Sequence, residues 1–502
     1  MRTITLDGRS LSFDDIRAIV DSPVQLALSP EAKRRIRKSR EIIDKALKAG
    51  RVMYGVNTGF GKLSDTRIEP ERIEELQRNL LLSHAAGQGA AHPHPRLLMA
   101  LRANSLAYGN SGVTVGLVER LIELFNRGFE PVIPEVGSVG ASGDLAPLAE
   151  LGCVMIGEGE AVWRGRRMKS RDALKKARIG PYRFHAKEAL SLINGTQLMS
   201  SILGEVLVGA ERLLKLADIA GAMSLEALKG SVKPFDPRVH EIRPHPGQVA
   251  VAENFRALVI DSEVMDSHRS CKKVQDAYCL RCIPQVHGAA RDAVSFARGV
   301  FEREINAVTD NPLVFDGGDV ISGGNFHGQP VAQAADFVAT ALTTIANIAE
   351  RRIDRLTNPD LSELPPFLIK ESGLNSGFMM VQVAAAALAA ECRVDATPAS
   401  VQSIPTGASK EDHVSMGPIA ARKARRVLEN ATSVIKLELL CAAQGLDFLE
   451  PLKPGVGVDE GHRAARKMVP HLKRDHYLRG MVARLDERAV LTAVEKRVGT
   501  LR

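Results

Sequence analysis

The chain has 502 residues, of which 45% are hydrophobic and 25% charged, a balance typical of globular proteins with a large core. Aromatic residues make up only 4%, so we expect an aliphatic core. The formal net charge of +8 suggests nucleic-acid binding, but residues 461–502 hold 11 Lys and Arg against 4 Asp and Glu and carry most of that surplus. We interpret this segment as basic amphipathic helix, for example over residues 464–476, with its charges on the solvated face. A nucleic-acid site is less consistent with the segment, because Tyr477 is its one aromatic residue on which a base could stack.

Neither a secretory signal nor a membrane span is indicated. Residues 1–7 lack the apolar stretch of a signal peptide, and the most apolar segment, residues 378–390, is too short to cross a bilayer. We therefore expect a cytoplasmic protein that binds neither membrane nor nucleic acid.

The six cysteines are scattered, and their spacing argues against a metal site. Cys279 and Cys282 form one CxxC pair, with Cys271 and His268 nearby. A zinc site needs a second pair or histidines at ligand spacing. We favour free thiols and expect no metal.

The first two fifths of the chain are predicted to mix short strands, turns and helices. Residues 3–11 suggest a hairpin that turns at Asp7-Gly8, and Ser12 then caps a helix with Asp15 at its third position. The other elements expected here are a helix from Ser29-Pro30 to Gly50, a glycine-rich loop over residues 51–62, a helix over residues 72–86 and a second hairpin over residues 157–168.

Beyond residue 194 the pattern changes to long helical periodicity. The expected fold is mainly α: a mixed N-terminal region, residues 1–195, followed by a long antiparallel helix bundle, residues 196–502. Such a bundle is too extended to bury every apolar face alone, so we expect an oligomer. The predicted helices cover residues 198–227, 284–306, 331–356, 377–396 and 416–444.

Residues 137–148, GSVGASGDLAPL, are the most informative segment. A phosphate-binding loop would need a lysine after the glycines, where Asp144 stands. A hydrolase nucleophile elbow around Ser142 would need glycine at that same position. The remaining interpretations are a glycine-rich turn with Asp144 as helix N-cap, or a loop whose own backbone is chemically modified. The second matters because no ordinary side chain is a strong electrophile.

The Ala141-Ser142-Gly143 tripeptide is similar to the one that aromatic amino acid ammonia-lyases cyclise into a methylidene-imidazolone group. The resemblance covers most of the chain and implies a fold of the fumarase/aspartase-like superfamily, with this self-made group and no diffusible cofactor. Further segments resemble the family's motifs and follow in its order: residues 54–61 (YGVNTGFG), 193–196 (INGT), 275–285 (QDAYCLRCIPQ), 309–313 (TDNPL), 323–328 (GGNFHG) and 410–416 (KEDHVSM).

The residues themselves leave alternatives for the catalytic roles. A phenol is a poor base near neutrality unless a positive charge assists it, so Tyr54 reads equally well as a packed side chain. Arg281 could bind the carboxylate of an amino acid substrate with its planar guanidinium fork, or it could form a structural ion pair within the protein. The resemblance implies that Tyr54 removes the β-proton, that Arg281 holds the substrate carboxylate and that Tyr278 assists near the electrophile. It further implies substrate contacts from Asn194, Gln275 and Phe326.

Within the family, the chain most resembles the enzymes that act on histidine. His84 stands where the phenylalanine and tyrosine enzymes usually carry Leu, and Glu411 lies in a Glu-Asp-His run. Together they would bind both nitrogens of an imidazole. Lys410 departs from the family, which usually has glutamine there, and it could weaken the grip of Glu411 on imidazole or point into a subunit interface.

The resemblance thus implies conversion of L-histidine to trans-urocanate and ammonia by a homotetramer whose active sites combine residues of several subunits. Two alternatives remain. One is a tyrosine or phenylalanine ammonia-lyase, or an aminomutase, of the same fold. The other is a non-catalytic helical scaffold that binds polyanions through its basic C-terminal segment.

Overall fold

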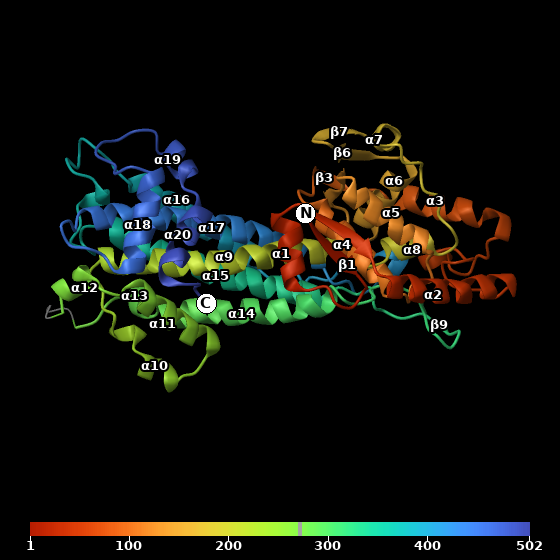
Figure 1. The fold of residues 1–502 in the computed structure, drawn as a ribbon, viewed down its shortest axis with the longest axis horizontal. Helices are drawn as coiled ribbons and strands as arrows, with labels where there is room; N and C mark the ends of the chain where they lie inside the picture. The colour runs from red at the N-terminus through yellow and green to blue at the C-terminus, as the bar shows by residue number, and fades with distance from the viewer. Residues whose placement is uncertain (270–273) are drawn as a thin grey trace. The chain divides into compact units, whose positions relative to one another are not determined.

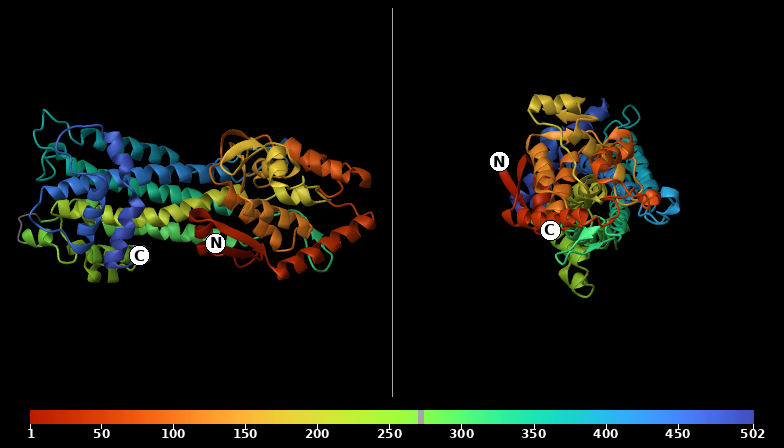
Figure 2. Two further views of the ribbon diagram at one scale, coloured as in Figure 1. Left: turned by 45° about the horizontal axis from the view of Figure 1, so that its top comes forward. Right: turned by 90° about the vertical axis from the view of Figure 1, so that its right-hand side faces the viewer.

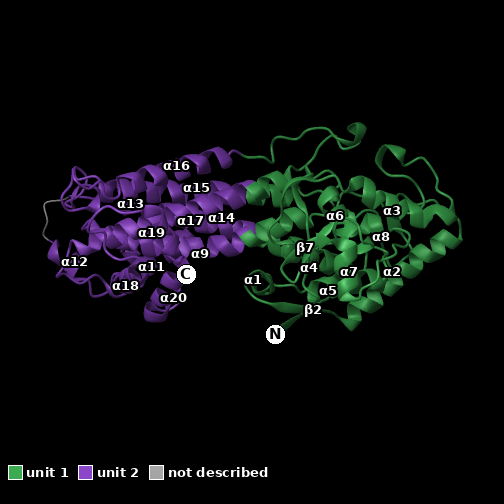
Figure 3. Ribbon diagram, turned by 90° about the horizontal axis from the view of Figure 1, so that it is seen from above, with its two compact units in different colours: residues 1–205, 298–335, 398–422 green, residues 206–297, 336–397, 423–502 purple. Residues whose placement is uncertain are grey.

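The computed structural model describes residues 1–269 and 274–502 and is mainly helical (Figure 1). The chain forms two compact units, shown in Figure 3. Unit 1 contains residues 1–205, 298–335 and 398–422, and unit 2 contains residues 206–297, 336–397 and 423–502. The mainly α expectation is confirmed. The compact units differ from the expected regions 1–195 and 196–502, and those regions stay a prediction about domains.

Four long helices explain why each unit combines separate stretches of the chain, because each contributes residues to both units. The four shared helices are α9 (Gln197–Ala227), α14 (Ile283–Glu304), α15 (Gln329–Thr357) and α17 (Gly417–Asp447). They confirm four of the long helical segments that were expected.

Unit 1 opens with β1 (Arg2–Leu6), α1 (Phe13–Asp21) and β2 (Val24–Leu28). The two strands pair in parallel, Ile4 opposite Leu26. The expected hairpin at Asp7-Gly8 is therefore wrong: the chain leaves β1 for a helix, and a strand that returns after a crossover helix pairs in parallel. Ser12 caps α1 as predicted, accepting from the backbone N–H of Asp15.

The helix α2 (Pro30–Lys48) also begins as predicted, because the Ser29 hydroxyl accepts from Ala32 N at 3.0 Å. The predicted hairpin over residues 157–168 is confirmed by β6 (Glu160–Trp163) and β7 (Arg166–Lys169), which pair antiparallel. The other helices and strands of unit 1 are α3 (Ile73–His84), β3 (Gln88–Ala91), α4 (Pro95–Ala107), α5 (Val115–Asn126), β4 (Phe129–Pro131), β5 (Pro134–Val136), α6 (Leu145–Ile156), α7 (Ser170–Ala177), α8 (Glu188–Ile193), β8 (Leu313–Val314) and β9 (Val320–Ile321).

Helices α3, α6 and α8 pack together in the core of unit 1. Gly152 on α6 makes the close approach possible, since a Cβ there would lie 2.5 Å from a methyl carbon of Leu81 and 3.1 Å from one of Leu192. One apolar core thereby holds the C-terminal end of α3, which carries His84, and the C-terminal end of α8, which precedes Asn194.

In unit 2 the long helices run alongside one another, as Figure 2 shows. Gly209 on α9 faces Leu428 on α17 so closely that a Cβ would meet a methyl carbon at 2.5 Å. Arg352 on α15 forms a fully buried ion pair with Glu438 on α17, with Nη2 2.9 Å from Oε2. The remaining helices of unit 2 are α10 (Pro237–Glu241), α11 (Pro246–Leu258), α12 (Glu263–Ser267), α13 (Tyr278–Arg281), α16 (Met379–Asp395), α18 (Val456–Met468), α19 (Leu478–Arg484) and α20 (Glu487–Val498).

The basic helix expected over residues 464–476 is only partly present. Helix α18 ends at Met468, before Pro470, and residues 469–477 are not helical. Leu472 turns inward and its N–H donates to Gln444 Oε1 at 3.1 Å. Among the described residues, α15 alone is long and apolar enough to cross a membrane, and 72% of its apolar window is buried inside the protein, as in a core helix.

Candidate active site

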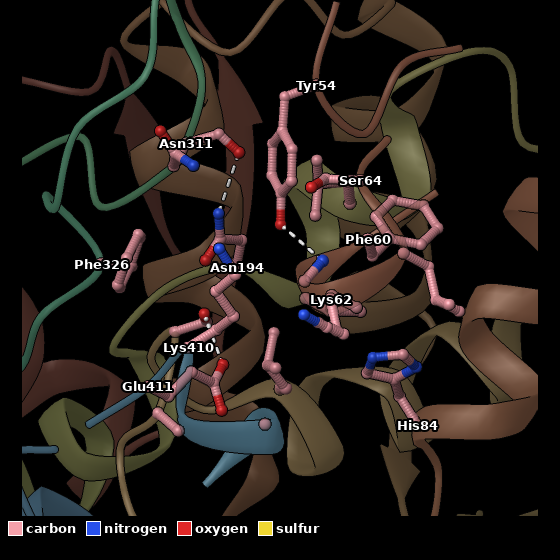
Figure 4. Close-up of a pocket in the computed structure, with 18 of the residues that line it drawn as sticks. Tyr54, Phe60, Lys62, Ser64, His84, Asn194, Asn311, Phe326, Lys410 and Glu411 are labelled. Carbon is pink, nitrogen blue, oxygen red and sulfur yellow. Dashed lines mark hydrogen bonds between the residues drawn. The ribbon is translucent and has the colours of Figure 1, made fainter. Parts of the chain in front are cut away.

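A cavity of about 1160 Å³ lies in unit 1, and every residue that lines it belongs to that unit. Six segments of the chain build its wall (Figure 4): residues 54–68, the end of α3, the loop before α6, the end of α8, and the two loops at residues 311–327 and 407–414. It therefore collects most of the residues singled out from the sequence: Tyr54, His84, Ala141, Ser142, Asn194, Phe326 and Glu411.

The Ala141-Ser142-Gly143 tripeptide lies in a strained turn at this wall. Ser142 has a φ of 50°, a left-handed conformation that non-glycine residues seldom adopt. Gly143 has a φ of 77°, and a Cβ on it would lie 2.2 Å from the carbonyl oxygen of Gly195, so only glycine fits. Ser138 fastens the turn by accepting from Gly140 N at 3.0 Å and donating to Gly143 O at 3.1 Å.

Asp144 ties this turn to α9. It occupies the N-cap position of α6 but makes no side-chain bond there. Its carboxylate accepts instead from Leu198 N at 2.9 Å and Met199 N at 3.0 Å, where α9 begins. Burial raises the pKa of Asp144 to about 7. The expected N-cap thus serves a different helix, because α9 begins beside the turn.

Glu411 faces the tripeptide. Its carboxylate accepts from the Ser142 hydroxyl at 3.0 Å and from the Thr406 hydroxyl at 2.8 Å. The loop that carries it is joined to the turn by a backbone bond from Met416 N to Val139 O at 2.8 Å.

Tyr54 enters the cavity from a glycine-rich loop (Figure 4), and its hydroxyl oxygen accepts from Gly61 N at 3.2 Å. Asn57 stabilises the loop, accepting from Met53 N at 2.8 Å and donating to Arg51 O at 2.9 Å. The loop therefore holds the Tyr54 hydroxyl inside the cavity.

His84 and Glu411 lie at two sides of the cavity in Figure 4. His84 ends α3, and its Nδ1 lies 3.0 Å from the Ser83 hydroxyl. Burial lowers the pKa of His84, against smaller opposing effects from Leu80 and the charge of Glu411. The imidazole is therefore neutral near pH 7, with one nitrogen that donates and one that accepts.

Asn194 follows α8 and offers an acceptor to a ligand. Its Nδ2 donates to Asn311 O at 2.9 Å, whereas its buried Oδ1 has no hydrogen-bond partner. Such an atom is costly to leave unpaired in a folded protein. Asn311 and Lys62 also line the cavity and were not predicted; Asn311 lies in the TDNPL motif, which offered a signal, whereas Lys62 offered none.

A buried polar network supports the Asn194 end of α8. Arg102 on α4 donates to Gln197 Oε1 at 2.7 Å and to the Ser191 carbonyl, and burial lowers its pKa to about 10. Lys187 and Asp310 form a fully buried ion pair at 3.0 Å. Neither group was predicted, because nothing in the sequence shows which distant residues are their partners.

Tyr278, Arg281 and Gln275 belong to unit 2, and none of them lines this cavity. The Arg281 guanidinium lies over the Tyr278 ring, 4.4 Å from its centroid. Tyr278 is 67% exposed, and Arg281 Nε is buried without a hydrogen-bond partner.

No cluster that could hold a metal is present in residues 1–269 and 274–502. Both ring nitrogens of His268 lie within 3 Å of backbone carbonyl oxygens, and Cys279 and Cys282 are free thiols. Cys271 lies outside the described residues.

A profile described as aromatic amino acid lyase matches residues 11–467. The chain belongs to this family. It is 52% identical to a histidine ammonia-lyase from Anaeromyxobacter sp. (strain K), over 95% of this chain and 96% of that relative. The structure resembles that of histidine ammonia-lyase from Trypanosoma cruzi, with a TM-score of 0.91, 41% identity, and coverage of 99% of this chain and 95% of that one. It also resembles tyrosine aminomutase from Streptomyces globisporus, with a TM-score of 0.93, 38% identity and full coverage of both chains.

Proposed function

We propose that the protein eliminates ammonia from L-histidine to give trans-urocanate. The observation that carries this proposal is the pairing of His84 with Glu411 in one cavity beside Ser142. An imidazole substrate has one nitrogen that donates and one that accepts, which Glu411 and a neutral His84 can satisfy together. A phenyl substrate would leave both groups unpaired, at about 1–3 kcal/mol each.

The loop fits the self-made electrophile of this family. Ring closure would join the Gly143 amide nitrogen to the Ala141 carbonyl carbon and release two water molecules, one of them carrying the Ser142 hydroxyl. The N–H of Gly143 makes only a long hydrogen bond, 3.3 Å to Gly140 O, and its α-carbon has no room for a side chain. Once formed, the methylidene-imidazolone group would supply an electrophilic carbon that no ordinary side chain offers, without a diffusible cofactor.

The residues of the cavity divide the remaining work. Tyr54 would accept the β-proton, since its oxygen already receives a hydrogen bond from Gly61 N and shares the cavity with Lys62 and Lys410. Asn194 would accept from the substrate through its unpaired Oδ1. Loss of the Ser142 hydroxyl would free one oxygen of Glu411 for the imidazole.

Tyr278 and Arg281 would act on the cavity of another subunit in a homotetramer, with Gln275 beside them. Arg281 suits a carboxylate because its fork can bind both oxygens. Helix α16 supports assembly, because it exposes apolar side chains that a second copy would cover: Met380 is 61%, Val383 46% and Val394 70% exposed. We place this enzyme in the cytoplasm.

An activity screen tests the proposal. The purified protein would be incubated with L-histidine, L-tyrosine and L-phenylalanine, and the absorbance of each conjugated product followed. We expect ammonia and product from histidine at least tenfold faster than from the other two. A preference for tyrosine or phenylalanine would contradict the histidine assignment.

The likeness to tyrosine aminomutase makes an aminomutase the second candidate. It would re-add ammonia at the β-carbon, so chromatography of the same reactions for β-amino acids separates the two. An intact mass equal to the translated value, without loss of two water molecules, would instead favour a non-catalytic scaffold.

A further inference from the structure

A second cavity, of about 700 Å³, lies in unit 1 and shares no lining residue with the candidate active site. Its size is typical of small-molecule sites. Four cationic side chains line it, Arg9, Arg34, Arg35 and Lys38, against one acidic residue, Asp316. The rest of its wall comes mainly from the segment that follows α4, including Tyr108, from the segment after α14, and from Leu313 and Phe315.

Two of the four cations are already paired with carboxylates. Arg34 Nη2 lies 2.9 Å from Glu31 Oε1, and Lys38 Nζ lies 2.9 Å from Asp316 Oδ2. Both pairs are exposed, so each contributes little to stability.

Arg9 and Arg35 form no ion pair among the described residues. Arg35 Nε donates to the Tyr108 carbonyl at 2.9 Å, and its Nη2 donates to the Asp7 and Ala107 carbonyls. The Arg9 guanidinium lies over the Tyr108 ring, 4.4 Å from its centroid. Both guanidinium groups are thus held against one residue.

Asp7 does not line the cavity and is occupied elsewhere. Its carboxylate accepts from the backbone N–H groups of Arg9 at 2.8 Å and Ser10 at 2.9 Å. Burial and the nearby charge of Arg9 lower the pKa of Arg35, against smaller opposing effects from the charges of Asp7 and Glu31.

We propose that this cavity binds the phosphate group of a small phosphorylated molecule between Arg9 and Arg35. A phosphate would accept hydrogen bonds from the guanidinium fork of Arg9 and from Arg35 Nη1, because Arg35 Nε and Nη2 already donate to backbone carbonyls. Its charge would offset the like-charge repulsion of the two arginines. Leu313 and Phe315, the latter 40% exposed, offer an apolar wall for the organic part of the ligand.

Calorimetric titration of the full-length protein in about 0.15 M salt, where exposed charges are well screened, tests the site. Phenyl phosphate and inorganic phosphate serve as probes. We expect saturable binding of both, tighter for phenyl phosphate, because its ring adds apolar contact. Replacing Phe315→Ala should remove that difference and leave inorganic phosphate binding within about twofold. Absence of saturable phosphate binding to the unaltered protein overturns the proposal.

Two variants that each remove one positive charge test whether phosphate binds in the cavity. Arg9→Gln should weaken phosphate binding at least tenfold, because it removes one charged fork. Arg37→Gln removes the same charge from an exposed position on α2 outside the cavity and should change binding less than twofold. Equal weakening in both variants would reveal general attraction to a basic helix and would sink the site.

If circular dichroism shows that Arg9→Gln does not fold, Arg35→Lys provides a second test of the phosphate site. Lysine keeps the charge but loses the fork, so we expect weaker phosphate binding in a folded protein. Unchanged affinity in this variant would contradict a role for Arg35 in phosphate binding.

Discussion

The carboxylate of Glu411 lies 3.0 Å from the hydroxyl of Ser142, although 269 positions separate the two residues in the chain. The residue proposed to orient the substrate is thus the hydrogen-bond acceptor of the serine proposed to become the electrophile. The two proposed roles occupy the same few ångströms, so variants of either residue should alter activity more than stability.

Replacing Ser142→Ala should abolish turnover while the fold persists. Alanine has no hydroxyl to lose, so the electrophilic carbon cannot form. We expect at least a thousandfold lower kcat, a chain mass without the loss of two water molecules, and unchanged circular dichroism. Full activity in this variant would end the proposed chemistry.

Replacing Tyr54→Phe should lower kcat by about 10²–10⁴-fold with little change in KM, because the ring remains and the proton acceptor is lost. Steady-state kinetics on histidine measures both constants. A matched rise in KM with unchanged kcat would show that Tyr54 binds substrate and does not transfer the proton.

Replacing His84→Leu should lower kcat/KM for histidine by about 10–100-fold, because one imidazole nitrogen loses its partner. The same variant should lose no more than about twofold on any residual phenylalanine activity, since a phenyl ring makes no such bond. Ser83→Ala is the control: it keeps the imidazole and removes only the hydroxyl 3.0 Å away. Equal losses on both substrates would assign His84 to structure.

Co-expression should reveal shared active sites. Ser142→Ala and Tyr278→Phe subunits, each nearly inactive alone, should regain activity when mixed, because Ser142 lines the cavity of its own chain whereas Tyr278 would serve another chain's cavity. Mixing Ser142→Ala with Tyr54→Phe should not restore activity, because both residues line one chain's cavity. Recovery in the second pair, or none in the first, would refute sharing through Tyr278.

Asp144 should make stability fall as the pH rises. Burial raises its pKa from 3.8 to about 7, so between about pH 4 and pH 7 the folded protein keeps a proton that the unfolded chain releases. The contribution of Asp144 is therefore complete below about pH 4 and is lost by about pH 7. Thermal unfolding should show a smaller drop in Tm from pH 5 to pH 8 in Asp144→Asn than in the unaltered protein. Identical drops would contradict a proton held by Asp144.

Local signals predicted the helices well. The caps at Ser12 and Ser29 and the long apolar periodicities depend on neighbouring residues alone, and the structure confirms them. The hairpin at Asp7-Gly8 failed because the same turn residues also lead from a strand into a helix. The helix expected to continue to His476 failed because Pro470 and the inward-facing Leu472 end it.

The site was predictable where its residues fall in motifs, and not where they act through distant partners. Ser142, His84 and Glu411 stand in segments that resemble a family and line one cavity. Arg102 and Lys187 gave no signal, because their partners Gln197 and Asp310 lie 95 and 123 positions away.

The close contact of Gly143 with Gly195 has a consequence for biosynthesis. The turn proposed to cyclise is shaped by backbone from residues 195, 198 and 416. A nascent chain stopped at residue 400 would lack the backbone of Met416, whose N–H donates to Val139 O in the turn. The tripeptide would then cyclise only after the first and second halves of the chain have folded against each other.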